Sequence, residues 1–173
     1  MSDPAQPGAK PISLPKTCAW AGALVFFDAF FLNQGVISAC IGLWMLLGAL
    51  PRAAFHKDHA QRRRRLARVA IYLGAVALVL GLNWANNRLA QSRAQTLIDA
   101  VKAYQQKHQR YPAKLDELVP EFVEQVPVAK YTLAFGGFYY VATPDYHGLF
   151  YVEMPPFGRP TYHFEQNAWG YVD

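Results

Sequence analysis

Two long apolar segments with a basic stretch between them constrain this chain more than any other feature. Residues 19–50 and 66–84 are almost wholly apolar, and much of the positive charge lies between them, from Arg52 to Arg68. The second segment, as an α-helix, is as long as one crossing of a hydrocarbon core of ~30 Å. The sequence therefore predicts a membrane protein with a soluble C-terminal part.

The first apolar segment is too long for one crossing and too short for two. We therefore expect residues 19–51 to form a first transmembrane segment with an interfacial part, crossing at about residues 35–50, with Pro51 ending the helix. Asp28, Asn33 and Gln34 interrupt the apolar run. A carboxylate at membrane depth is costly and indicates function or a partner, so an intramembrane polar cluster is the alternative to a simple cap or headgroup contact.

The arginines predict the topology. Arg62, Arg63, Arg64, Arg65 and Arg68 stand directly before the second apolar segment. Positive charge within reach of a bilayer is retained in the cytoplasm, so residues 52–65 are interpreted as a basic cytoplasmic loop that touches membrane lipids, not nucleic acid. With a second transmembrane helix at residues 66–88, the chain is predicted to be a multi-pass protein of a bacterial inner membrane with a periplasmic C-terminal domain.

Residues 1–18 are rich in proline and polar residues, which predicts a disordered tail. Residues 89–173 form the soluble domain. It opens with an apolar stripe at steps of three and four, which continues the second membrane helix without a break: Ala94, Leu97, Ile98, Val101 and Tyr104.

From Lys130 onward the period changes to two. The runs at 131–135, 138–143, 149–154 and 161–165 are dense in aromatic and β-branched residues and predict three or four antiparallel strands. The predicted fold class is therefore α+β: two transmembrane helices, the second continuing into a long amphipathic helix packed on a small antiparallel β-meander.

A segment rich in tyrosine and proline ends the helical stripe. Its residues are Tyr104, Tyr111, Pro112, Leu115, Leu118, Val119, Pro120 and Pro127. The chain resembles pilins and the pseudopilins of type II secretion, because it combines a long helix half in the membrane, this tyrosine-proline segment and a small sheet. The resemblance implies a pilin-like periplasmic domain that binds a protein partner in a secretion or pilus system.

The sequence also departs from that family. Prepilins carry a Gly-aromatic cleavage site and a Glu five places into the mature helix, whereas "RRRRLARVAIYLG" precedes the second apolar segment here. We therefore expect a domain that stays fixed in the membrane as an accessory or scaffold, and not a filament subunit.

Residues that could carry chemistry are few. His56 and His59 flank Asp58 in the basic stretch, where cations are repelled, so a solvated loop is the favoured interpretation. Along the strands stand further titratable residues that could form a metal or acid–base site but are more typical of structural roles: Asp145, His147, Glu153, His163 and Glu165. We predict no catalytic residue, no cofactor and no metal.

The domain has more aromatic residues than so small a core can bury. Tyr139, Tyr151, Tyr162 and Trp169 are predicted to form a contact surface, with packing on lipid headgroups as the alternative. The predicted function is a non-enzymatic scaffold that acts through protein contacts. The alternative is a periplasmic ligand-binding or sensor module anchored in the inner membrane.

Overall fold

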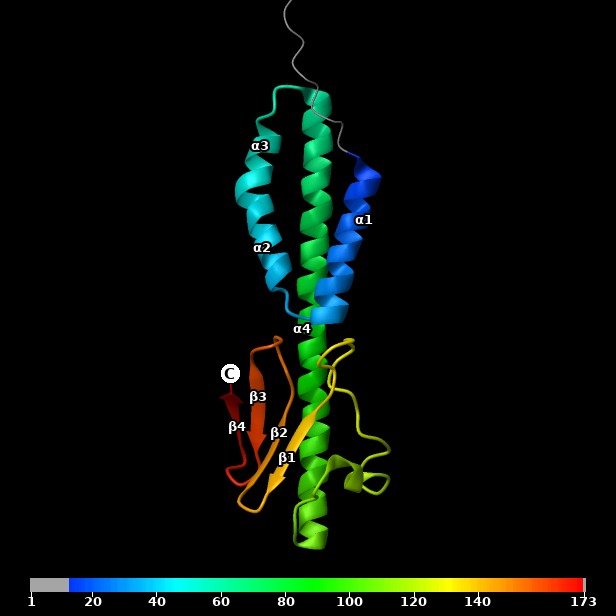
Figure 1. Cartoon of the computed structure of the whole chain (residues 1–173), viewed down its shortest axis with the longest axis vertical. Helices are drawn as coiled ribbons and strands as arrows, with labels where there is room; N and C mark the ends of the chain where they lie inside the picture. Colours follow the sequence, from blue (N-terminus) through cyan, green and yellow to red (C-terminus); the bar gives the residue numbers. More distant parts are fainter. Residues whose placement is uncertain (1–12, 173) are drawn as a thin grey trace, which may run out of the picture.

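One helix organises the whole molecule in this computed structural model, which describes residues 13–172 (Figure 1). Helix α4, His59–His108, is 50 residues long and has no break between its membrane half and its soluble half, as the sequence predicts. Asp58 caps its start, because the carboxylate accepts hydrogen bonds from the backbone N–H groups of Ala60 and Gln61. Since α4 starts at His59, Arg62 to Arg65 are helical, and the predicted loop of residues 52–65 is only the short link before Asp58.

The first apolar segment forms a helical hairpin instead of one span with an interfacial part. Its first arm is α1, Leu14–Val25, followed by the π-helical η1, Phe26–Leu32; its second arm is α2, Val36–Trp44, then η2, Met45–Ala49, and α3, Leu50–Ala54. Asn33 and Gly35 both have positive φ, 53° and 73°, and reverse the chain between the arms. Each arm has 19 residues and, like α4, is long and apolar enough to cross a membrane.

The structure thus has three helices long and apolar enough to cross a membrane, one more than the two transmembrane helices that the sequence predicts. Length counted over residues 19–50 was too short for two crossings, but the arms extend beyond that run to Leu14 and Ala54. Pro51 does not end a helix. It sits in the first turn of α3, where its missing N–H costs little. Of the predicted tail, residues 1–12 lie outside the described residues and Leu14 to Cys18 are helical.

The two arms lie on opposite sides of α4, so the membrane part is a layer of three helices (Figure 1). The start of α1 and the start of α4 lie at the end away from the sheet. Lys16 of α1 thus joins the arginines of α4 at one end of the bundle, and the sheet lies beyond the other end.

The soluble domain carries one antiparallel sheet with strand order β1-β2-β3-β4. The strands are β1, Tyr139–Thr143; β2, Tyr146–Phe150; β3, Arg159–His163; and β4, Ala168–Val172. The predicted meander is present, but its members differ: residues 131–135 form a loop, whereas β4 was not predicted.

The core of the domain lies between the sheet and one stripe of α4. Leu97, Ile98 and Val101 of α4 are fully buried and belong to the same cluster as Leu149 of β2 and Tyr162 of β3. At the far end of α4, the 3-10 helix η3, Leu115–Leu118, closes this core. A small sheet alone would be only marginally stable, so α4 supplies its missing apolar partner.

Candidate ligand-binding pocket beside the membrane

An asparagine belt, Asn33, Asn83 and Asn86, lies where the hairpin turns and the apolar part of α4 ends. The Asn86 side chain donates from Nδ2 to Oδ1 of Asn33, 3.1 Å away, and joins α4 to the hairpin turn. Gly35 packs closely on Asn83, since a Cβ there would lie 3.0 Å from its Nδ2. Trp84, in the same turn of α4, is exposed. Trp side chains favour membrane–water interfaces, and this turn is the boundary of the apolar part of α4 on the side of the sheet.

The predicted polar cluster sits at this boundary and has a structural task. The fully buried Asp28 carboxylate accepts hydrogen bonds from the backbone N–H groups of Gly35 and Ser38, both at 2.8 Å, and so caps α2. Asn33 binds α4, and the Gln34 side chain donates to the carbonyl of Pro155 in the domain. Asp28 thus holds the hairpin turn together, and Asn33 and Gln34 join it to α4 and to the domain.

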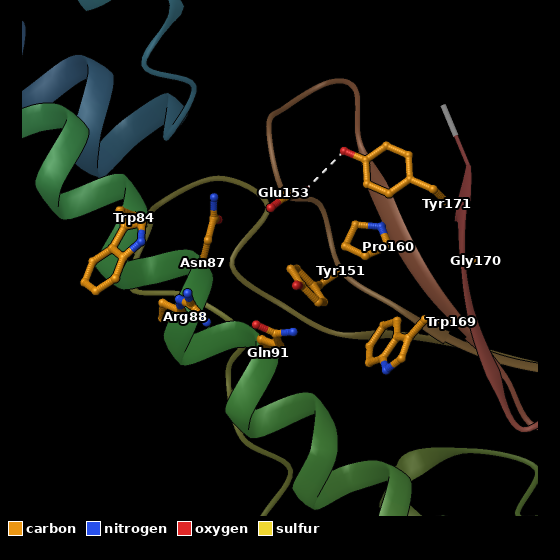
Figure 2. Close-up of a pocket in the computed structure, with 10 residues that line it drawn as sticks. All are labelled: Trp84, Asn87, Arg88, Gln91, Tyr151, Glu153, Pro160, Trp169, Gly170 and Tyr171. Carbon is orange, nitrogen blue, oxygen red and sulfur yellow. Dashed lines mark hydrogen bonds between the residues drawn. The ribbon is translucent and has the colours of Figure 1, made fainter.

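A cavity of about 540 Å³ opens between α4 and the sheet just beyond this boundary (Figure 2). We call it the juxtamembrane pocket. Its wall residues are Trp84, Asn87, Arg88 and Gln91 on one face of α4, and Tyr151, Glu153, Pro160, Trp169, Gly170 and Tyr171 on the sheet side. The volume lies in the range of sites for small molecules and cofactors.

The pocket exists because α4 covers only part of the sheet. The register pairs Tyr162 with Trp169 and Pro160 with Tyr171, which puts these side chains on the face turned toward α4. Tyr162 is 5% exposed, yet Trp169 is 42% and Tyr171 58% exposed. The core cluster takes residues from β2 and β3 but none from β4. The inner face of β4 is therefore uncovered and forms one wall.

The charged groups of the pocket are arranged unequally. The Arg88 guanidinium lies 5.6 Å from the centre of the Trp84 ring, and it has no ion pair to any residue in 13–172. Glu153, by contrast, accepts a hydrogen bond of 3.1 Å from the Tyr171 hydroxyl. Burial raises the pKa of the Tyr151 phenol to about 12, so this phenol is neutral at ordinary pH. Among the described residues, Arg88 is thus a cation of the pocket without an ion-pair partner, while Glu153 is held by Tyr171.

A buried lysine supports the wall from behind. Lys130 is almost wholly buried and donates from Nζ to the backbone carbonyl of Glu153, 2.6 Å away. Burial lowers the pKa of Lys130 to about 8, and the charge of Glu153 opposes this only in part. The lysine fixes the segment after β2 that presents Tyr151 and Glu153 to the pocket.

Of the predicted acid–base residues, His147 and Glu165 come together, whereas Asp145, Glu153 and His163 lie elsewhere. His147 Nδ1 lies 2.7 Å from Glu165 Oε1, while His163 is on the opposite face of the sheet, against Gly170. Burial would raise the pKa of Glu165, but hydrogen bonds from the His147 ring and backbone hold it below its usual value. Glu153 belongs to the juxtamembrane pocket instead.

No three His, Cys, Asp or Glu side chains gather in a metal-binding arrangement within residues 13–172. His56 accepts the N–H of Asp58, which itself caps α4. Asp145 stands in the turn between β1 and β2.

The predicted contact surface is wrong in part. Tyr139 lies on the outer face, half-exposed and stacked on Phe150 at 5.0 Å between ring centres. Trp169 faces the pocket. Tyr151 and Tyr162 are buried, because they face α4 and not the solvent. Alternation along a strand requires its register to be known before any residue can be assigned to a face.

The tyrosine-proline segment packs at the end of α4 that is far from the apolar helices. The Tyr104 hydroxyl donates to Glu117 Oε2 at 2.6 Å, and the Ala113 N–H donates to the other carboxylate oxygen at 3.0 Å. The hydrogen bond from Tyr104, with Ala113 and Arg110, holds the pKa of Glu117 below its usual value despite partial burial. Glu117, which sequence reasoning missed, thus joins the tyrosine-proline segment to α4. Pro112, Leu115 and Leu118 are buried, Tyr111 and Pro127 half-buried, and Val119 and Pro120 exposed.

Sequence reasoning also missed Arg88 and Tyr171 as pocket residues. Arg88 had a signal, since it follows Trp84 by one helical turn and is the first charge after the apolar segment. Tyr171 had none. Comparison of the chain with protein-family models, curated proteins and solved structures found no match.

Proposed function

We propose that this chain is a membrane-anchored binding module, and not an enzyme, whose ligand occupies the juxtamembrane pocket. The observation that carries this proposal is the uncovered inner face of β4. Trp169 lies on the core-facing side of the sheet and is nevertheless 42% exposed, opposite Arg88 of α4. A sheet face that α4 covers only in part leaves room for a ligand.

The chemistry of the walls indicates the class of ligand. The rings of Trp84, Trp169 and Tyr171 offer flat faces for stacking, and Arg88, which has no ion pair within residues 13–172, offers donors for an anionic group. Asn87 and Gln91 add amide groups along the same face of α4. The ligand we propose therefore has a ring-shaped or apolar body and one anionic group.

The proposed location is a bacterial inner membrane with the domain in the periplasm. The apolar helices support membrane insertion, and the arginines at the opposite end of the bundle support a cytoplasmic position for that end. Three crossings would then leave the start of α1 on the cytoplasmic side.

A second candidate is the scaffold in a secretion or pilus system. Two features support the pilin-like interpretation: a long helix packed on a four-stranded antiparallel meander, and the tyrosine-proline segment around Tyr111-Pro112. The outer face of the sheet favours protein contacts, since Tyr139 and Val141 are exposed there.

Site-specific photo-crosslinking separates the two candidates. A photoreactive amino acid would replace Gln91, which lines the pocket, or Val141, which lies on the outer face, in the full-length membrane protein in its native host. The binding module predicts a small-molecule adduct on the chain at position 91 that is absent at position 141. Adding Arg88→Gln should reduce that adduct, because the anionic group loses its partner.

Equal adducts at both positions, or none at position 91, would disprove the binding module. Crosslinks to one defined protein at position 141 alone would support the scaffold.

A further inference from the structure

The opposite end of the bundle has a second cavity, between the end of the hairpin and the start of α4. It has a volume of about 320 Å³. We call it the arginine cleft. Its lining residues are Trp44, Met45, Ala49, Arg52, Ala53, Arg65, Arg68 and Val69. It is separate from the juxtamembrane pocket and lies at the other end of the apolar part of α4.

Three guanidinium groups line this cleft. Arg65 and Arg68 are three residues apart on α4 and so lie on neighbouring parts of one helix face, while Arg52 comes from α3. Among the described residues, none of the three has a carboxylate partner. The nearby Asp58 is used as the cap of α4. The cleft therefore concentrates positive charge that no carboxylate within residues 13–172 neutralises.

Arg52 is held at the cleft by a specific local geometry. Its Nη1 donates to the backbone carbonyl of Gly48, one helical turn earlier, at 2.9 Å. Gly48 leaves room for this fold-back, because a Cβ there would lie 3.1 Å from Nη1 of Arg52 and 3.5 Å from the indole of Trp44. The hydrogen bond thus keeps the exposed Arg52 guanidinium close to the backbone of its own helix, at the edge of the cleft.

The rest of the cleft is apolar. Met45, Ala53 and Val69 are almost wholly buried and form a small core that joins the second arm of the hairpin to α4. The cleft therefore has basic groups on its rim and an apolar floor between two helices. Free phosphate or another soluble anion would use the rim and leave the floor unfilled.

We propose that the arginine cleft binds the headgroup of an anionic phospholipid from the leaflet around it. Guanidinium groups bind phosphate oxygens in a bidentate manner, and basic pockets between transmembrane helices hold anionic headgroups. The lipid phosphate lies among Arg52, Arg65 and Arg68, and an acyl chain lies along Met45 and Val69. The helices end at this level, so such lipids surround the cleft at high concentration.

Native mass spectrometry of the full-length protein tests this. The protein would be purified in mild detergent, freed of endogenous lipid, and titrated with phosphatidylglycerol, cardiolipin, phosphatidylcholine or inorganic phosphate. We expect retained adducts of phosphatidylglycerol and cardiolipin. Arg65→Gln/Arg68→Gln should weaken these adducts by about fivefold for each arginine removed.

Arg62→Gln/Arg63→Gln is the matched control, because it removes the same charge from the same end of α4 and neither residue lines the cleft. Its adducts should equal those of the wild type. If Arg65→Gln/Arg68→Gln fails to fold, Arg52→Gln gives the same test from α3, with an expected loss of about fivefold.

Three results would overturn the proposal. Equal losses in the cleft variant and the control would reduce the effect to general charge. Equal retention of phosphatidylcholine would remove the role of the anionic headgroup. Displacement of the lipid by millimolar inorganic phosphate would assign the cleft to a soluble anion.

Discussion

The two halves of α4 differ in the size of the side chains that they bury. In the apolar half, buried residues of α4 are small or medium in size, such as Ala75, Val76 and Val79, whereas Leu78 is 52% exposed. In the soluble half, the large residues Leu97 and Ile98 point inward.

This difference follows from the solvent on each side. Lipid tails are as apolar as leucine, so helices in a membrane gain little by burying large side chains and pack through small ones. Water gives apolar burial its driving force, so the soluble half needs the sheet as a cover. One continuous helix therefore packs through small residues in its first half and through large apolar residues in its second half. The change occurs at the asparagine belt.

The strongest way to break this comparison is the same substitution in both halves. Leu97→Ala, at a position that is 0% exposed, should lower the free energy of unfolding by about 2–5 kcal/mol through lost burial and a cavity. Leu78→Ala, at a position that is 52% exposed toward lipid, should change it little. Thermal unfolding in detergent, followed by circular dichroism and by proteolysis of the domain, measures both. Similar losses would show that the two halves are packed by one rule.

A second test compares two capping aspartates. Asp28→Ala would leave the N–H groups of Gly35 and Ser38 without partners in a buried place, which costs about 1–3 kcal/mol for each group. Asp58→Ala should cost clearly less, because water replaces an exposed cap. Membrane abundance and melting temperature would report the difference. Unchanged abundance and stability of Asp28→Ala would refute the capping role.

A third test uses pH and sharpens the description of the soluble half. The pKa of Lys130 is lowered by burial from 10.5 to about 8. Between these values the unfolded chain keeps a proton that the folded chain has lost, so stability should rise with pH, by on the order of 1 kcal/mol per unit. Tyrosines titrate near the upper limit, so the profile is compared with that of Lys130→Met, which should lack the rise. Parallel profiles would contradict the buried ammonium.

The smallest expected effect lies at the far end of α4. Tyr104→Phe removes the hydroxyl that donates to Glu117, so the pKa of Glu117 should rise toward its usual value. The melting temperature should fall by only a few degrees, since the Phe ring still fills the core. Titration of Glu117 by NMR in the wild type and in Tyr104→Phe tests this. An unchanged Glu117 pKa would remove the hydrogen bond from the account.

Local patterns predicted the long helix, the meander and the packing of one on the other, because period and side-chain type are properties of neighbouring residues. They failed at the hairpin, where Asn33 and Gly35 reverse the chain through positive φ within three residues. The same polar residues look like an interruption of one span when only length is counted. β4 was missed because Gly170 and the left-handed Asn167 weaken its pattern.

The juxtamembrane pocket could not be predicted from neighbouring residues at all. Arg88 and Tyr171 meet across it only because the sheet extends past the edge of α4, which depends on sheet twist and register. The arginine cleft was closer to prediction, since the arginines were conspicuous. Which of them turn inward depends on the hairpin, and the hairpin was not foreseen.

The bonds between the hairpin turn and the domain have a consequence for the biosynthesis of the protein. Asn86 binds Asn33 through one amide atom and the N–H of Tyr131 through the other, and the N–H of Leu133 donates to the carbonyl of Phe30. These partners come from the hairpin, α4 and the domain, so during biosynthesis the bonds form only after all three segments have packed together. Resistance to proteolysis near residue 131 would therefore report whether the hairpin has docked on the domain.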